Sequence, residues 1–188
     1  MKNSNPQIII DSTTTEADLY SIIDLQQKNL AKNISQKEAF EQGFTFVEYD
    51  FNLLKRICDA EPAIVARENN KLIGYAIILT RAFGSQIPEL APMFTLFDTL
   101  PYEKQKFGNA SYVLIGQICI AKEFRGRGIF DQLYNQIIAS LSSRFEYLIT
   151  EVAVRNTRSM NAHQRVGYNV FHSYEDIGEK WNTLILKM

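Results

Sequence analysis

The stretch Gln117-Ile118-Cys119-Ile120-Ala121-Lys122-Glu123-Phe124-Arg125-Gly126-Arg127-Gly128-Ile129-Phe130 is the most informative part of this 188-residue chain. It passes from an apolar strand, through a basic turn with two glycines, to the start of a helix. The first N–H groups of a helix have no partner within it, so such a turn can donate to a phosphate. Gly126 and Gly128 permit positive φ angles and close approach of a ligand, and Arg125 and Arg127 supply charged donors. The turn therefore predicts a binding site for a polyanion.

The residues after the turn have the pattern of an amphipathic helix. Ile129, Leu133, Ile137 and Leu141 recur at helical spacing, and Asp131 in the first turn suits the positive end of the helix dipole. This pattern predicts a helix that extends to Ser143.

Three readings of the turn compete. A solvated corner between strand and helix is the simplest, because short glycine and arginine motifs are weak signals. A dinucleotide-binding fold would use Gly126 and Gly128 as its first two glycines and Glu151 as its ribose-binding acid, but Asp131 replaces the third glycine. A nucleoside triphosphate loop is not supported, because the sequence contains no G-x-x-x-x-G-K-[ST].

The third reading, after the solvated corner and the dinucleotide-binding fold, depends on two motifs that follow one another along the sequence. Arg125-x-x-Gly128-x-Phe130 resembles the [QR]-x-x-G-x-[GA] turn that holds the pyrophosphate of acetyl-CoA in the GNAT superfamily of N-acetyltransferases. The segment 156–168, Asn-Thr-Arg-Ser-Met-Asn-Ala-His-Gln-Arg-Val-Gly-Tyr, is similar to the later N-x-x-[AS]-x-x-x-[YH]-x-x-x-G-[FY] segment of that superfamily. A helix and the strand expected at 147–154 separate the two. The resemblance is specific over residues 110–175 and, upstream, consistent in the order of elements.

The resemblance implies a mixed α+β fold. It has a central, mostly antiparallel sheet of about seven strands, flanked by helices, with one parallel strand pair that splays to admit the pantetheine arm of acetyl-CoA. A bulge in the central strand would free an N–H for the thioester oxyanion. The cofactor contacts implied are Ile118, Cys119, Ile120, Arg125, Gly126, Arg127, Gly128, Ile129, Phe130, Asn156 and Ser159.

The implied chemistry is direct transfer of the acetyl group to a primary amine. His163 stands where the superfamily more often has a tyrosine, so it is the candidate acid for the leaving thiolate; otherwise it is a helix histidine satisfied by a backbone carbonyl. Glu151 is the best candidate base, although a strand glutamate paired with an arginine is the simpler interpretation. Cys119 has no adjacent base and is read as a buried thiol.

Other motif residues also have simpler readings. Asn156 could contact pantetheine or cap its own helix, and the small side chain of Ser159 could serve packing alone. Phe130 departs from the glycine or alanine of the superfamily, and its place on the apolar stripe of the helix predicts that it points into the core. An acyl-CoA sensor without catalysis is therefore the alternative function.

Composition sets the remaining limits. The chain is 46% hydrophobic and 22% charged, with 20 basic and 21 acidic residues, which is typical of one globular domain over residues 1–188 and gives no support for nucleic acid or membrane binding. Two cysteines and two histidines give no support for a metal site, and no hydrophobic leader follows the polar start, so a cytoplasmic location is expected.

Periodicity and turn signals predict the order of elements. Asn69-Asn70 should join a hairpin, and residues 81–110 form an irregular excursion with one or two helices over 89–100. The terminal strands should pair around a turn at 177–179. Strands are expected at 7–10, 63–68, 72–80, 111–121, 147–154, 168–174 and 181–188, and helices beginning near residues 15, 35, 51, 129 and 156.

The resemblance implies that the acceptor enters between residues 31–49 and 81–108. A small-molecule amine is expected, because nothing in the chain signals docking of a protein partner. Aromatic residues in these segments could line its pocket, belong to the core or cover a homodimer contact. They are Phe40, Phe44, Phe46, Phe83, Phe94, Phe97, Tyr102 and Phe107.

Overall fold

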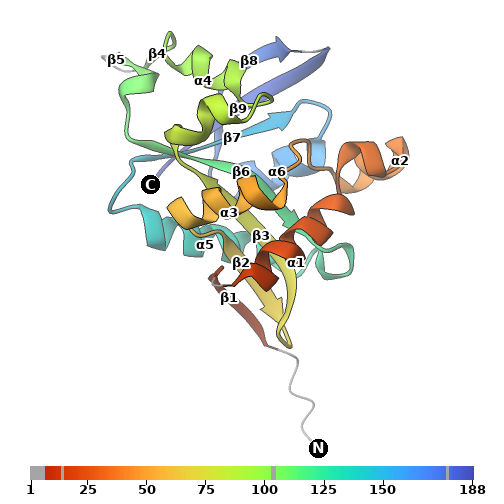
Figure 1. Cartoon of the computed structure of the whole chain (residues 1–188). Coiled ribbons are helices and arrows are strands. Elements are labelled where there is room, and N and C mark those ends of the chain that lie inside the picture. Colours follow the sequence, from red (N-terminus) through yellow and green to blue (C-terminus); the bar gives the residue numbers. More distant parts are fainter. Residues whose placement is uncertain (1–6, 14, 103–104, 177) are drawn as a thin grey trace, which may run out of the picture.

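The computed structural model describes residues 7–13, 15–102, 105–176 and 178–188, and it forms a mixed α+β fold around one seven-stranded sheet (Figure 1). This confirms the predicted fold class. Ile177, in the turn predicted at 177–179, lies outside the described residues. Across the sheet the strands are β1 (Ile8–Ser12), β2 (Ile64–Glu68), β3 (Lys71–Leu79), β6 (Tyr112–Ile120), β7 (Tyr147–Ala153), β9 (Glu179–Lys187) and β8 (Asn169–Asp176).

The helices follow the predicted order. A short two-stranded ribbon, β4 (Pro101–Tyr102) with β5 (Gln105–Lys106), lies outside the main sheet and was not predicted. The α-helices are α1 (Glu16–Gln27), α2 (Gln36–Gln42), α3 (Phe51–Ala60), α4 (Ala91–Phe97), α5 (Ile129–Leu141) and α6 (Thr157–Arg165).

Local signals explain where these elements begin. Thr15 and Asp18 form a reciprocal capping box at the start of α1, and the Asp50 side chain accepts from the Leu53 N–H at the start of α3. The β2–β3 hairpin turns through Asn69 and Asn70, whose φ angles are 50° and 62°. Asparagine tolerates this left-handed region, so the pair suits a tight hairpin turn.

Each face of the sheet buries its own core. Helices α1 and α3 pack over one face together with the excursion that contains α4, and α5 packs behind the other (Figure 1). The second core contains the predicted apolar stripe of α5, including Leu133 and Ile137, which are fully buried. This burial fixes the direction of α5 and thereby the position of the turn that precedes it.

The centre of the sheet holds the parallel pair. Strands β6 and β7 pair from Tyr112 with Tyr147 to Leu114 with Ile149, and beyond these residues their described registers end. Both strands continue, so they splay apart. With the other pairings antiparallel, the sheet excludes the doubly wound parallel architecture of a dinucleotide-binding domain.

A bulge lies in β6 where the splay opens. Opposite β3, Ile115 pairs with Ile78 and Gln117 with Ile77, so Gly116 is the extra residue. A Cβ added to Gly116 would lie 2.7 Å from the Tyr49 hydroxyl and 2.3 Å from Leu79 Cδ1, which leaves no room for a side chain. The bulge that the resemblance implied is therefore present.

The excursion at 81–110 is more ordered than the sequence indicated. The guanidinium of Arg81 donates to the Gly108 carbonyl and pairs with Asp98 at 2.5 Å, which ties its two ends together. Phe97 and Phe107 are fully buried against the sheet at a ring separation of 5.1 Å. One α-helix forms over the predicted range, preceded by a 3₁₀ helix at Arg81–Gln86.

Candidate active site

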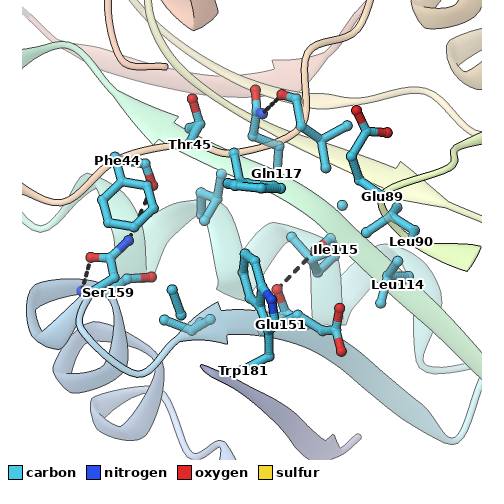
Figure 2. Close-up of a pocket in the computed structure, with 18 of the residues that line it drawn as sticks. Phe44, Thr45, Glu89, Leu90, Leu114, Ile115, Gln117, Glu151, Ser159 and Trp181 are labelled. Carbon is cyan, nitrogen blue, oxygen red and sulfur yellow. Dashed lines mark hydrogen bonds between the residues drawn. The ribbon is translucent and has the colours of Figure 1, made fainter. Parts of the chain in front are cut away.

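Two cavities meet where β6 and β7 splay. The larger, of about 580 Å³, lies between the β6–α5 turn and α6, and we call it the turn cavity. The smaller, of about 80 Å³, lies between the splayed strands and is called the splay pocket (Figure 2). The residues that line both are Phe44, Thr45, Ile118, Asn156 and Ser159.

The turn has the backbone geometry predicted for an anion site. Gly126 and Gly128 have φ angles of 77° and 73°, and a Cβ added at either would meet no atom within 4 Å. Gly128 is the N-cap of α5, and the N–H groups of residues 126–128 make no hydrogen bond to another described residue. These donors face open space at the positive end of a helix.

The arginine side chains of the turn correct the prediction. Arg125 turns inward, where its Nε donates to the Ile120 carbonyl at 3.0 Å and its Nη2 to Asn29 Oδ1 at 2.6 Å. The guanidinium of Arg127 pairs with Glu68 at 2.6 Å and does not line the turn cavity. Neither side chain is free for a ligand, because each fixes the turn to a neighbouring element.

Two arginines of α6 supply positive charge to the turn cavity instead. Arg158 and Arg165 line the turn cavity, and Arg165 pairs with Asp131 at 2.7 Å. Sequence reasoning missed both. Their spacing with Ala162, which also lines the cavity, places all three on one helix face, and this periodicity was the available signal.

Beyond Leu114, the edge of β6 that faces β7 has no described strand partner, whereas its other edge stays paired with β3. Ile118, Cys119 and Ile120 line the turn cavity, although the Ile120 carbonyl already accepts from Arg125. The Cys119 side chain is buried in the core, and burial raises the pKa of this thiol to about 12. It is therefore protonated and unreactive at neutral pH.

Asn156 joins α6 to the loop that crosses the splay. Its Oδ1 accepts from the Ser159 N–H at 3.3 Å, which is the predicted cap, and its Nδ2 donates to the Phe44 carbonyl at 3.1 Å. We call residues 43–49 the strap. Asn156 thus holds one end of the strap beside both cavities.

Two buried glutamines that the sequence did not reveal hold the rest of the strap. Gln117 donates to the Val47 carbonyl at 2.7 Å, and the Gln26 amide both donates to and accepts from the Tyr49 backbone at 3.0 Å. Gln117 interrupts an apolar strand and Gln26 lies in a buried helix face. A polar residue at such a place needs a partner, which was the only signal.

His163 is buried, with 1% of its surface exposed, and it needs a correction. Its Nδ1 lies 2.8 Å from the Ser159 carbonyl, whereas Nε2 has no hydrogen-bond partner among the described residues. Burial lowers the pKa of His163 to about 4, so it is neutral at pH 7 and not partly protonated as expected. The Nδ1 contact to a carbonyl favours the tautomer with the proton on Nδ1.

Phe130 packs as predicted toward the second core. Its ring centroid lies 5.1 Å from that of His163 and 5.0 Å from that of Tyr134. It also lines the turn cavity, so the α5 residue that departs from the motif forms a wall without closing the space.

Glu151 lines the splay pocket two residues beyond the last parallel pairing. Its Oε1 accepts from the Tyr174 hydroxyl at 2.7 Å and from Thr183 Oγ1 at 3.1 Å. Burial raises the pKa of Glu151 to about 7, against the lowering effect of these two hydrogen bonds. The alternative pairing with an arginine does not occur, because Glu151 forms no salt bridge with another described residue.

The aromatic residues of the two segments divide among the splay pocket, the surface and the core. Phe44 and Trp181 line the splay pocket (Figure 2). Phe46 lines it too, and its ring meets that of Trp181 edge-on at 5.1 Å. Phe40 is instead 70% exposed on α2. The remaining aromatics of the two segments pack in or against the first core: Phe83, Phe94, Phe97, Tyr102 and Phe107.

The described residues offer neither a metal cluster nor a membrane-spanning helix. They hold no group of three or more His, Cys, Asp or Glu side chains arranged for a metal ion. None of their helices is long and apolar enough to cross a membrane.

Comparison with solved structures finds the same fold in other proteins. The NatC complex bound to Gag peptide and CoA matches with a TM-score of 0.66 at 16% identity, covering 97% of this chain and 99% of that one. The acetyltransferase yncA of Salmonella typhimurium with acetyl-CoA matches with a TM-score of 0.62 at 14% identity, covering 96% and 93%. An N-acetyltransferase of Staphylococcus aureus has a TM-score of 0.62 at 16% identity, covering 96% and 98%.

Sequence comparison adds the family. No curated protein matches the chain significantly. The model of the acetyltransferase (GNAT) family matches residues 31–168, which include the splayed strands, the glycine turn and the motif of α6. The chain therefore belongs to the GNAT acetyltransferase family.

Proposed function

We propose that this protein transfers the acetyl group of acetyl-CoA directly to the primary amine of a small molecule. The observation that carries the proposal is the meeting of two unlike cavities at the strand splay. The turn cavity offers unpaired N–H groups and arginines, whereas the charged residues of the splay pocket are Glu89 and Glu151.

The turn cavity suits a coenzyme with a pyrophosphate. The N–H groups of residues 126–128 would bind its phosphate oxygens, with Arg158 and Arg165 adding charge. The open β6 backbone at Ile118 and Cys119 would bond to the pantetheine arm as an added strand would. Asn156 and Ser159 then lie at the junction with the splay pocket, where the thioester is expected.

Glu151 is the proposed general base. A carboxylate with a pKa of about 7 can take the proton of an attacking amine near neutral pH. The amine nitrogen forms a bond to the acetyl carbonyl carbon, the C–S bond breaks, and the proton passes from nitrogen to Glu151. A backbone N–H at the Gly116 bulge would stabilise the oxyanion that forms between these steps.

Protonation of the leaving thiolate stays a prediction for His163. The neutral imidazole would need its proton on Nε2, and the Nδ1 bond to the Ser159 carbonyl opposes that tautomer. Water is the other proton source. The same observation favours the second candidate function, an acyl-CoA sensor that binds but does not transfer.

One pair of measurements tests the proposal. Calorimetric titration with acetyl-CoA should show saturable binding, and a thiol-release assay with a panel of small primary amines and short peptides should show transfer to a small amine. Binding without transfer to any acceptor would support the sensor. Transfer to peptides alone would overturn the small-molecule assignment, and absence of binding would overturn both functions.

A further inference from the structure

The splay pocket contains one more carboxylate than acetyl transfer requires. Glu89 and Glu151 are the charged residues among those lining it, and the described lining includes no lysine or arginine. Neither glutamate forms a salt bridge with another described residue. The pocket therefore contains two carboxylates without a cationic partner from the protein.

Glu89 is held at the pocket even though its side chain is exposed. Ile87, two residues before it, and Leu90, the next residue, are buried with 1% and 6% of their surface exposed. The Leu90 and Ala91 N–H groups both donate to the Ile87 carbonyl, at 3.0 and 3.1 Å. This turn, anchored on both sides, presents the carboxylate at a fixed place on the excursion.

The two glutamates share one side of the pocket. Figure 2 shows Glu89 and Glu151 on the side of Leu90 and Leu114, away from Phe44 and Ser159 at the junction with the turn cavity. Phe46, which is 44% exposed, meets Trp181 edge-on and completes an aromatic wall. Aromatic faces and carboxylates together favour a cationic guest with an apolar body.

We propose that the acceptor is an amine that carries a second cationic group, and that Glu89 binds that second group while Glu151 serves the reacting nitrogen. This rests on the proposed acetyl transfer and adds the substrate class. A lone carboxylate would accept any primary amine equally, whereas a second one selects for two positive charges. Glu89 is thus the specificity-determining residue of the pocket.

Matched acceptors test this directly. The probes are diaminoalkanes with four to eight carbons, each compared with the monoaminoalkane of the same length by thiol release at low salt. For the preferred length, we expect kcat/KM to be about tenfold higher for the diamine than for the monoamine, a typical value for one charge-assisted contact. Added salt should reduce this preference, because it screens the contact.

Glu89→Gln should lower the diamine-to-monoamine ratio of kcat/KM to about one. Glu175→Gln is the control, since Glu175 is exposed on β8 and does not line the pocket. A diamine no better than its monoamine at every length would overturn the inference while leaving acetyl transfer intact. Equal loss for both acceptors in Glu89→Gln would also overturn it. If acetyl-CoA binds and no amine is acetylated, it is the proposed function that fails.

Discussion

At the scale of single residues, the environment of Glu151 gives this carboxylate its expected role. A buried carboxyl group held by two hydroxyl donors is fixed in direction and also costly to ionise. Such a group changes charge near neutral pH, which an exposed glutamate does not. The pH dependence of turnover is therefore the property that reports on it.

We expect the rate of acetylation to rise with pH through about 7 and then level off, because Glu151 must lose its proton before it can accept one. Glu151→Gln should remove this step and lower the rate of the chemical step by about 10² to 10⁴-fold. Single-turnover transfer measured from pH 5.5 to 9 would show both.

Tyr174→Phe provides the matched control. The Tyr174 hydroxyl lowers the pKa of Glu151, so its removal should move the step to higher pH without abolishing it. If the rate still rises at the same pH in both Glu151→Gln and Tyr174→Phe, the step reports the ionisation of the acceptor amine. That result would contradict the role of Glu151 as base.

At the scale of elements, the β6–α5 turn combines an open face with a left-handed backbone conformation that glycine adopts without strain and other residues do not. Gly128 has a φ of 73° and no neighbour above its Cα, so a side chain there would project into the space assigned to the coenzyme. Gly128→Val should therefore weaken acetyl-CoA binding by at least about tenfold, measured by calorimetry.

The backbone strain that valine causes at a positive φ must be separated from the loss of coenzyme contact. Gly178 has a φ of 71°, is equally open and lies outside both cavities, so Gly178→Val carries the same backbone penalty. We expect similar stability losses for the two variants but unchanged affinity in Gly178→Val. Equal affinities in both would remove the turn from the coenzyme site.

Elements with local signals could be predicted from sequence. Helix α3 begins at Phe51, as predicted, because Asp50 caps it, and the asparagine turn defined the β2–β3 hairpin. The predictions that failed concern contacts between residues far apart in the sequence. Arg125 turns inward because Asn29 Oδ1, 96 residues away in the sequence, accepts a hydrogen bond from its guanidinium, and no spacing within the turn reveals such a partner.

At the scale of the whole molecule, a buried neutral histidine couples folding to pH. His163 has a pKa of about 4 when folded and about 6.5 when unfolded, so the unfolded chain binds the extra proton between these values. Its contribution to the free energy of unfolding is fully present above pH 6.5 and is lost as the pH falls toward 4, by on the order of 3 kcal/mol.

Urea denaturation from pH 4 to 7.5 would measure the contribution of His163 as the difference in the free energy of unfolding between wild type and His163→Phe. Glu151, with its raised pKa, acts in the opposite sense, since its folded form keeps a proton that the unfolded chain releases as the pH rises from 4.5 to 7. Wild type and His163→Phe both contain Glu151, so its contribution cancels in the difference between their free energies of unfolding. His172→Asn, on β8, should keep the wild-type slope, and an equally steep slope in His163→Phe would contradict the assignment.

The splay pocket is assembled from distant parts of the chain: the strap, the turn at Glu89, the splayed strands and Trp181 on β9. The turn cavity is formed by the strap, the stretch from β6 into α5, and α6. Phe46, Glu89 and Trp181 line the splay pocket alone, so substitutions there would re-line the proposed acceptor pocket without touching the proposed coenzyme end. Evolution and protein engineering have the same freedom here, to exchange the acceptor while the donor stays the same.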